Sequence, residues 1–157
     1  MSLVRENVQD YPRPPALEPV SDRLSVVLNG VEVAATARGF RVLETHHAPT
    51  YYFPPEDVRE GVLRASAGRT LCEWKGVARY FDVIAEPREE LRAAWSYPAP
   101  TRAFAPIAGH VAFYPGQMDA CFVGELRVLP QPGSFYGGWL TPNLDGVVKG
   151  GPGTEGW

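Results

Sequence analysis

Glycine and proline interrupt this chain so often that little room is left for a long helix. The sequence has 16 glycines and 16 prolines among 157 residues, about a fifth of the chain, whereas these residues usually make up roughly 12%. Both favour turns, because proline lacks a backbone donor and glycine is costly inside a helix. With 45% hydrophobic residues, the chain has enough apolar material for one compact core. We therefore expect a mainly β protein with a single small antiparallel β-domain.

The clearest local signal is the pair Asn29-Gly30, which separates two β-branched runs at residues 24–28 and 31–35. Such a pair predicts a tight hairpin, because both turn residues must adopt positive φ. Further strands are expected at 40–45, 50–53, 69–74, 77–83, 93–97, 110–114 and 121–128, the last two paired with each other. One short helix is predicted over 55–63, where acidic residues follow two prolines.

The chain divides by composition into three parts. Residues 1–23 are proline-rich and predict an extended N-terminal arm, either a strap on the domain surface or a ligand for another protein. Residues 24–129 predict the β-domain. Residues 130–157 form a Gly/Pro-rich C-terminal tail that packs on the domain or extends from it. We expect this irregular tail to be ordered where Phe135, Tyr136, Trp139 or Trp157 finds a pocket.

The charge and cysteine content narrow the classes of function. A net charge of −3 with scattered basic residues argues against a nucleic-acid partner. The N-terminus lacks the apolar stretch of a signal peptide, and no apolar run approaches the roughly 20 residues that span a bilayer. A cytoplasmic protein without a membrane partner is expected. Cys72 and Cys121 are too few for a four-cysteine zinc site, so we expect free thiols, no metal and no cofactor.

Five ordered motifs resemble a known family. Residues 72–80 read CEWKGVARY, residues 94–98 read AWSYP and residues 107–114 read IAGHVAFY; RVLET at 41–45 and YYFPPEDV at 51–58 precede them. Together they resemble the DUF427 family, a bacterial domain of unknown function, over roughly residues 24–125. The family sometimes carries a nucleotidyltransferase label, but this chain has no glycine-rich phosphate loop and no paired carboxylates at metal-binding spacing.

The resemblance implies an all-β domain of the Mss4-like, or β-tent-like, group. That group includes zinc-binding proteins and methionine sulfoxide reductases of the B type. This chain lacks the two C-x-x-C pairs of those proteins, and fold alone does not establish function. We therefore expect neither structural zinc nor the redox chemistry of that group.

Aromatic side chains are dense in the matched region, and those with polar tips suit the wall of a small-molecule pocket. We expect an unidentified small molecule to bind in an aromatic-lined cleft. Lys75 stands before Gly76, where it contacts an anion or is simply a solvated turn residue. The candidate ligand-binding residues are Glu44, Tyr52, Trp74, Lys75, Tyr80, Trp95, Tyr97 and His110.

The sequence is also compatible with other functions. An enzyme using Cys72 or His110 in the same cleft is one alternative, although Cys72 also fits a buried strand position and His110 a structural hydrogen bond. Glu44 also fits a simple ion pair with Arg41 or another basic residue. A protein-interaction module acting through the proline-rich arm is another alternative, and a second copy of the chain, as a homodimer, is a candidate partner.

Overall fold

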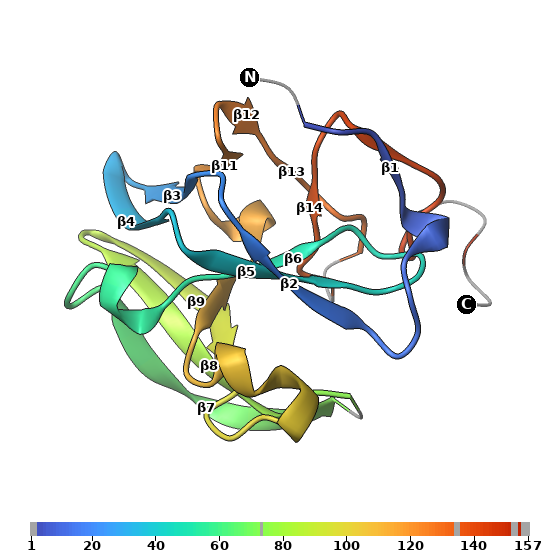
Figure 1. The fold of residues 1–157 in the computed structure, drawn as a ribbon. Helices are drawn as coiled ribbons and strands as arrows, with labels where there is room; N and C mark the ends of the chain where they lie inside the picture. The colour runs from blue at the N-terminus through green and yellow to red at the C-terminus, as the bar shows by residue number, and fades with distance from the viewer. Residues whose placement is uncertain (1–2, 73, 134–135, 152–153, 155–157) are drawn as a thin grey trace.

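The computed structural model describes residues 3–72, 74–133, 136–151 and 154. Over these residues the chain is mainly β, and its helical segments are short 3₁₀ turns (Figure 1). The strands are β1 (Glu6–Asn7), β2 (Ala16–Val20), β3 (Leu24–Leu28), β4 (Val31–Thr36), β5 (Gly39–Leu43), β6 (Thr50–Tyr52), β7 (Leu63–Cys72), β8 (Gly76–Ala85), β9 (Arg88–Ser96), β10 (Val111–Phe113), β11 (Ala120–Val123), β12 (Leu126–Arg127), β13 (Leu129–Pro130), β14 (Trp139–Leu140) and β15 (Leu144–Asp145). The 3₁₀ helices are η1 (Val8–Asp10), η2 (Pro55–Asp57), η3 (Arg102–Ile107) and η4 (Pro115–Gln117).

The hairpin predicted around Asn29-Gly30 is confirmed. Strands β3 and β4 pair antiparallel, and Asn29 and Gly30 have φ values of 51° and 73°. The Asn29 side chain donates hydrogen bonds to the carbonyls of Ala85 and Glu86. The turn therefore also fixes the loop between β8 and β9. Strands β11 and β12 complete this sheet in the order β12-β11-β3-β4.

The longest strands form a second sheet, in the order β10-β9-β8-β7. Strand β7 begins at Leu63, inside the region where a helix was expected. The predicted helix over 55–63 is wrong beyond its first turn, because η2 ends at Asp57 and Val58 forms an isolated bridge to Ala34. A one-turn helix has little stability of its own, so pairing with the neighbouring strands decides the conformation after Asp57.

The expected pairing of strands near 110–114 and 121–128 is also wrong. Strand β10 pairs with β9, whereas β11 pairs with β3 and β12. The turn η4 carries the chain from one sheet to the other, which explains why neighbouring strands in the sequence do not pair. Phe113 of β10 and Val123 of β11 bury their side chains in the same core from these two sheets.

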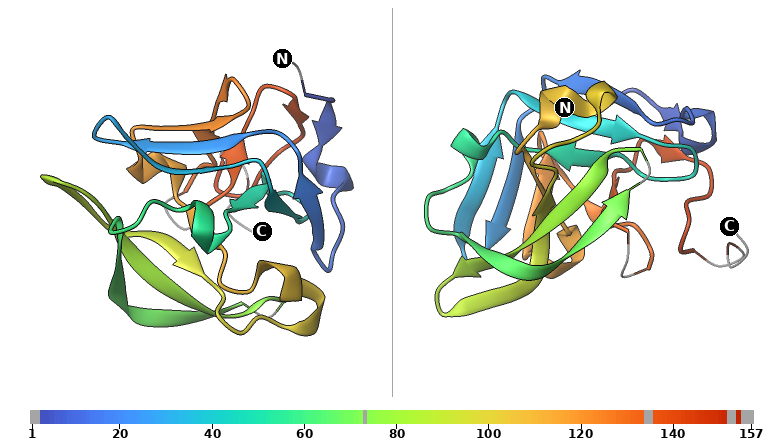
Figure 2. Two further views of the ribbon diagram at one scale, coloured as in Figure 1. Left: turned by 60° about the vertical axis from the view of Figure 1, so that its left-hand side comes forward. Right: turned by 90° about the horizontal axis from the view of Figure 1, so that it is seen from below.

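Two main hydrophobic cores hold the sheets together. The larger one contains buried side chains of β3, β4 and β11 and of β8, β9 and β10. The second contains Val42 and Tyr52 of the sheet β2-β5-β6 and Tyr80 and Trp95 of β8 and β9. Figure 2 shows the curved sheet of β7, β8 and β9 on one side of the molecule and the other sheets opposite it. Both cores therefore depend on side chains of β8 and β9.

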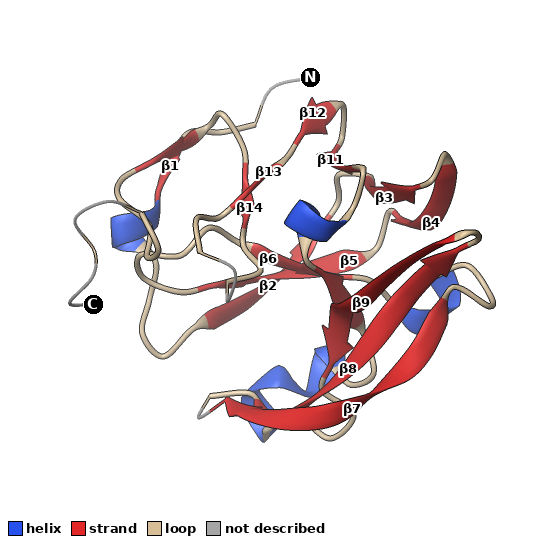
Figure 3. Cartoon of the chain, turned by 180° about the vertical axis from the view of Figure 1, so that it is seen from behind, coloured by secondary structure: helices blue, strands red, loops and turns tan. Residues whose placement is uncertain are grey.

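The N-terminal arm and the C-terminal tail lie together on the domain (Figure 3). Strand β2 of the arm pairs with β5, and β1 pairs in parallel with β15 of the tail. Trp139 is fully buried in the larger core, and its indole N–H donates to the Phe113 carbonyl at 3.1 Å. The expectation that Trp139 anchors the tail is confirmed. Phe135 and Trp157 lie outside the described residues.

In the part of the chain that the structure describes, no helix has the length and apolar character that crossing a membrane requires.

Candidate functional site

A cavity of about 410 Å³ opens beside the second core. It lies where the ends of β7 and β8, the end of β9, strand β6 and the C-terminal tail come together. Seven of the eight candidate residues line it, and the eighth, His110, does not. The lining residues are Glu44, His47, Thr50, Tyr52, Thr70, Leu71, Cys72, Trp74, Lys75, Tyr80, Trp95, Tyr97, Tyr114, Tyr136, Gly137 and Lys149.

Strand register explains why these aromatic side chains meet. Tyr80 of β8 stands directly opposite Trp95 of β9. Alternation along β8 places Ala78 and Tyr80 inside and Arg79 outside. Tyr52 reaches the same place from β6, with its ring 6.4 Å from that of Trp95. The rings therefore come from two sheets and form one continuous wall.

Lys75 lies in the tight turn between β7 and β8, yet it is buried, with 9% of its surface exposed. The segment after β9 covers it: the Thr101 N–H donates to the Lys75 carbonyl at 3.0 Å. The ammonium lies 5.8 Å from the Tyr97 ring centroid and 5.9 Å from that of Phe104. The alternative that Lys75 is a solvated turn residue is therefore wrong.

The Lys75 ammonium has no ion pair or hydrogen bond within the residues that the structure describes; its contacts are the two rings. Cation–π contacts contribute about 0.5–2 kcal/mol each. Removing an ion from water costs several kcal/mol even after relaxation. The rings therefore offset a part of this cost, and an anion placed in the cavity would offset more.

Positive charge dominates the described lining of the cavity. Lys75 and Lys149 face a single carboxylate, Glu44. They are also the two lysines of the entire chain, since the other 13 basic residues are arginines. Burial, reinforced by the charges of Lys149 and Lys75, lowers the pKa of His47 to about 4. His47 is thus neutral at pH 7, and the lysines determine the sign of the site.

Tyrosine hydroxyls supply most of the remaining polar groups. Burial raises the pKa values of Tyr52 and Tyr97 above the ordinary range, and it raises that of Tyr114 to about 12. The Tyr80 hydroxyl shares a hydrogen bond of 2.8 Å with the Thr70 hydroxyl. The Tyr52, Tyr97 and Tyr114 phenols stay protonated at neutral pH, so the cavity offers O–H donors as well as ammonium groups.

The C-terminal tail completes the wall with Tyr136, Gly137 and Lys149. Gly137 lies so close to Trp95 that an added Cβ would come within 2.1 Å of the indole ring. The sequence did not point to these three residues as part of a site. A glycine or lysine in an irregular tail carries no periodic signal, and in the sequence only the aromatic residues of the tail, Trp139 among them, indicated that it docks.

The structure also shows where His110, Glu44 and the two cysteines lie. His110 lies outside the cavity, with its ring 5.8 Å from that of Phe40. Glu44 lines the cavity and does not pair with Arg41, which binds other carboxylates. Cys72 lines the cavity and Cys121 is buried in the larger core, both as free thiols. Whether the cavity residues bind a ligand together stays a prediction.

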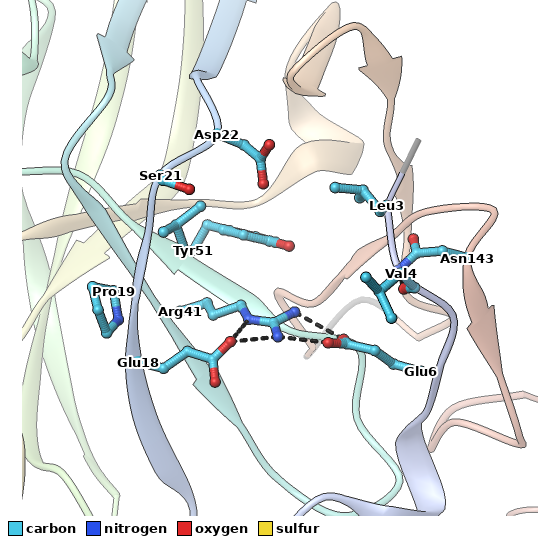
Figure 4. A pocket seen from close by; sticks show the side chains of 11 residues that line it. Leu3, Val4, Glu6, Glu18, Pro19, Ser21, Asp22, Arg41, Tyr51 and Asn143 are labelled. Carbon is cyan, nitrogen blue, oxygen red and sulfur yellow. Dashed lines mark hydrogen bonds and ion pairs between the residues drawn. The ribbon is translucent and has the colours of Figure 1, made fainter. Parts of the chain in front are cut away.

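A second cavity, of about 240 Å³, lies between the first residues of the N-terminal arm and its strand β2 (Figure 4). At its floor the Arg41 guanidinium donates to Glu6 at 2.7 and 2.9 Å and to Glu18 at 2.6 Å. Figure 4 shows Arg41 between the two carboxylates, which neutralise its positive charge within the protein. This arrangement fixes the arm against β5 and offers a ligand no free cation.

The fold and the cavity define a small antiparallel β-domain with an aromatic, lysine-containing cleft. The chain matches the family model described as a domain of unknown function, DUF427, over residues 16–124. It therefore belongs to the DUF427 family. No curated protein matches the chain. Among the residues that the structure describes, no group of three or more histidine, cysteine, aspartate or glutamate side chains is arranged to hold a metal ion.

Proposed function

We propose that this protein binds a small organic molecule in the aromatic cleft. One observation carries the proposal: side chains from two sheets and the tail enclose a cavity of about 410 Å³, within the range of roughly 300–1,000 Å³ that is typical of ligand sites. Its wall combines apolar ring faces with a few polar tips, which is the composition of a binding pocket rather than of a sealed core.

The cleft also has a rigid frame. Tyr52, Tyr80 and Trp95 are at most 9% exposed and belong to the second core. Their positions are fixed by strand pairing and packing in the absence of a ligand, so little conformational entropy is lost on binding. A preformed site of this kind favours a compact, rigid ligand.

A thermal-shift screen with a metabolite library tests the proposal. A ligand at 100 times its dissociation constant stabilises the fold by about 2.7 kcal/mol, which corresponds to about 5–10 °C for a domain of this size. Trp74→Leu alters a half-buried wall residue, and His110→Ala serves as the matched control outside the cavity. We expect the shift to be lost in Trp74→Leu and kept in His110→Ala. A ligand that shifts both variants equally, or a library with no hit, would contradict the proposal.

A second candidate, an enzyme that uses Cys72, is favoured by one specific contact. Cys72 lines the cavity, and a hydrogen bond between Cys72 and Tyr97 contributes to the raised pKa of that phenol. His110, the other residue named for this candidate, is not among the described lining residues. Accessibility of Cys72 to a thiol reagent is the first requirement of this candidate.

A further inference from the structure

We propose that the ligand of the cleft is a compact aromatic carboxylate and that Lys75 binds its anionic group. This inference rests on the proposed function and adds the chemical class of the ligand. It is carried by Lys75, a residue with 9% of its surface exposed, which lines the cavity; its ammonium has ring contacts but no anionic partner among the described residues. A buried charge is normally paired, so an unpaired one beside an open cavity points to an anion that arrives with the ligand.

The positions of the two lysines also support a ligand with a negative charge. The chain has two lysines, 74 positions apart in the sequence, and the fold brings both to one cavity. The arginines that form ion pairs in this protein bind carboxylates elsewhere, for example Arg41 with Glu6 and Arg64 with Asp82. Lys75 and Lys149 both line the cavity, and neither has an ion pair within the described residues.

The charge balance of the described lining selects a monoanion. Two lysines face one glutamate, and His47 is neutral at pH 7, so the lining carries a net charge near +1. A carboxylate matches this charge, whereas a phosphate monoester carries about −1.5 to −2. A cationic ligand would lie against two like charges.

The wall around Lys75 selects a flat ring for the rest of the ligand. Trp74, Trp95 and Tyr97 present aromatic surface within the same cavity, and aromatic rings pack well against one another in stacked or edge-to-face arrangements. The Tyr52 and Tyr97 phenols stay protonated and can donate to a second oxygen of the ligand. A neutral sugar would use the same rings but would leave Lys75 without a counter-charge.

Matched pairs of acid and amide test this inference on the full chain. Benzoate, 4-hydroxybenzoate and indole-3-carboxylate are compared with their primary amides, which have nearly the same shape without the charge; phenyl phosphate is included as the dianion. Binding is measured by isothermal titration calorimetry and by thermal shift. Lys75→Met removes the proposed anchor, and Arg79→Met removes an equal charge from the exposed face of β8 as the control.

We expect at least one acid to bind at least tenfold more tightly than its amide, Lys75→Met to lose at least tenfold in affinity, and Arg79→Met to bind as the wild type does. Amides that bind as tightly as the acids, or a Lys75→Met variant with unchanged affinity, would overturn the inference while the proposed function stands. Phenyl phosphate binding more tightly than every acid would overturn the assignment of a carboxylate. If no acid and no amide binds, the inference fails, and the library screen decides separately on the proposed function.

Discussion

Gly137 of the tail lies directly against the Trp95 indole, and a methyl group added there would come within 2.1 Å of the ring carbon Cη2. Such a distance is far below van der Waals contact, so the two residues occupy adjoining space with no room to spare. The tail thereby closes one side of the cleft, and the position of the indole depends on the absence of a side chain at Gly137.

Gly137→Ala is predicted to displace either the tail or the Trp95 indole. Overpacking of this kind typically costs about 1–3 kcal/mol, so the free energy of unfolding in urea should fall by about this amount. Gly116→Ala is the control, because its added Cβ would meet Pro130 at 3.6 Å, an ordinary contact. Equal stability of Gly137→Ala and the wild type would show that the tail does not hold the wall of the cleft as described.

Cys72 and Cys121 are predicted to differ in reactivity. Burial raises the pKa of the Cys121 thiol to about 12, whereas Cys72 lines the cavity. A disulfide reagent should therefore modify one thiol per folded chain, a bound acid should slow that reaction, and Cys72→Ser should abolish it. Complete protection of both thiols in the folded protein would exclude the second candidate, an enzyme that uses Cys72.

The Glu6–Arg41 pair is predicted to make stability depend on pH. The hydrogen bonds from Arg41 hold the pKa of Glu6 below its ordinary value. Their contribution is thus fully present above the unfolded pKa of about 4.3 and is lost as the pH falls through the lower folded value. Glu6→Gln should lower the free energy of unfolding by about 1–3 kcal/mol at pH 7 and should flatten its decrease below pH 5.

Asp145→Asn is the control for Glu6→Gln. Asp145, on strand β15 beside β1, pairs with Arg5, but both side chains are at least half exposed, and solvent screens such pairs. We expect no measurable change in stability from Asp145→Asn. A pH dependence that is identical in the wild type and in Glu6→Gln would show that the partly buried Glu6–Arg41 pair does not hold the arm.

Local signals in the sequence predicted much of the fold. The Asn29-Gly30 hairpin depends on two residues that tolerate positive φ. Strands β8 and β9 depend on the alternation of apolar and polar residues. Both signals come from residues that are neighbours in the sequence. The helix after Pro55 failed because pairing with distant strands overrode a weak local preference. The pairing of β10 and β11 failed because it depends on which sheet each strand joins. The Mss4-like architecture stays a prediction.

For the site, too, the sequence predicted what depends on local residue types but not what depends on contacts between distant segments. Tyr52, Trp74, Tyr80, Trp95 and Tyr97 were accessible to sequence reasoning, because polar-tipped aromatic residues are dense in the matched region. The burial of Lys75 was not, since it depends on the segment after β9 folding over the turn. Lys149 could not be predicted either, because its place in the cavity is set by the docking of the tail around Trp139.

The most direct test of the account is urea denaturation of the wild type and Lys75→Met, each with and without the tightest-binding acid. An uncompensated charge inside a protein destabilises the fold, and replacing even paired buried ions by apolar residues is often neutral or stabilising by about 1–4 kcal/mol. We predict that Lys75→Met is more stable than the wild type without the acid, and that the acid stabilises the wild type alone. A variant that is less stable without the acid, yet still stabilised by it, would contradict the role of Lys75 as an unpaired cation awaiting an anionic ligand.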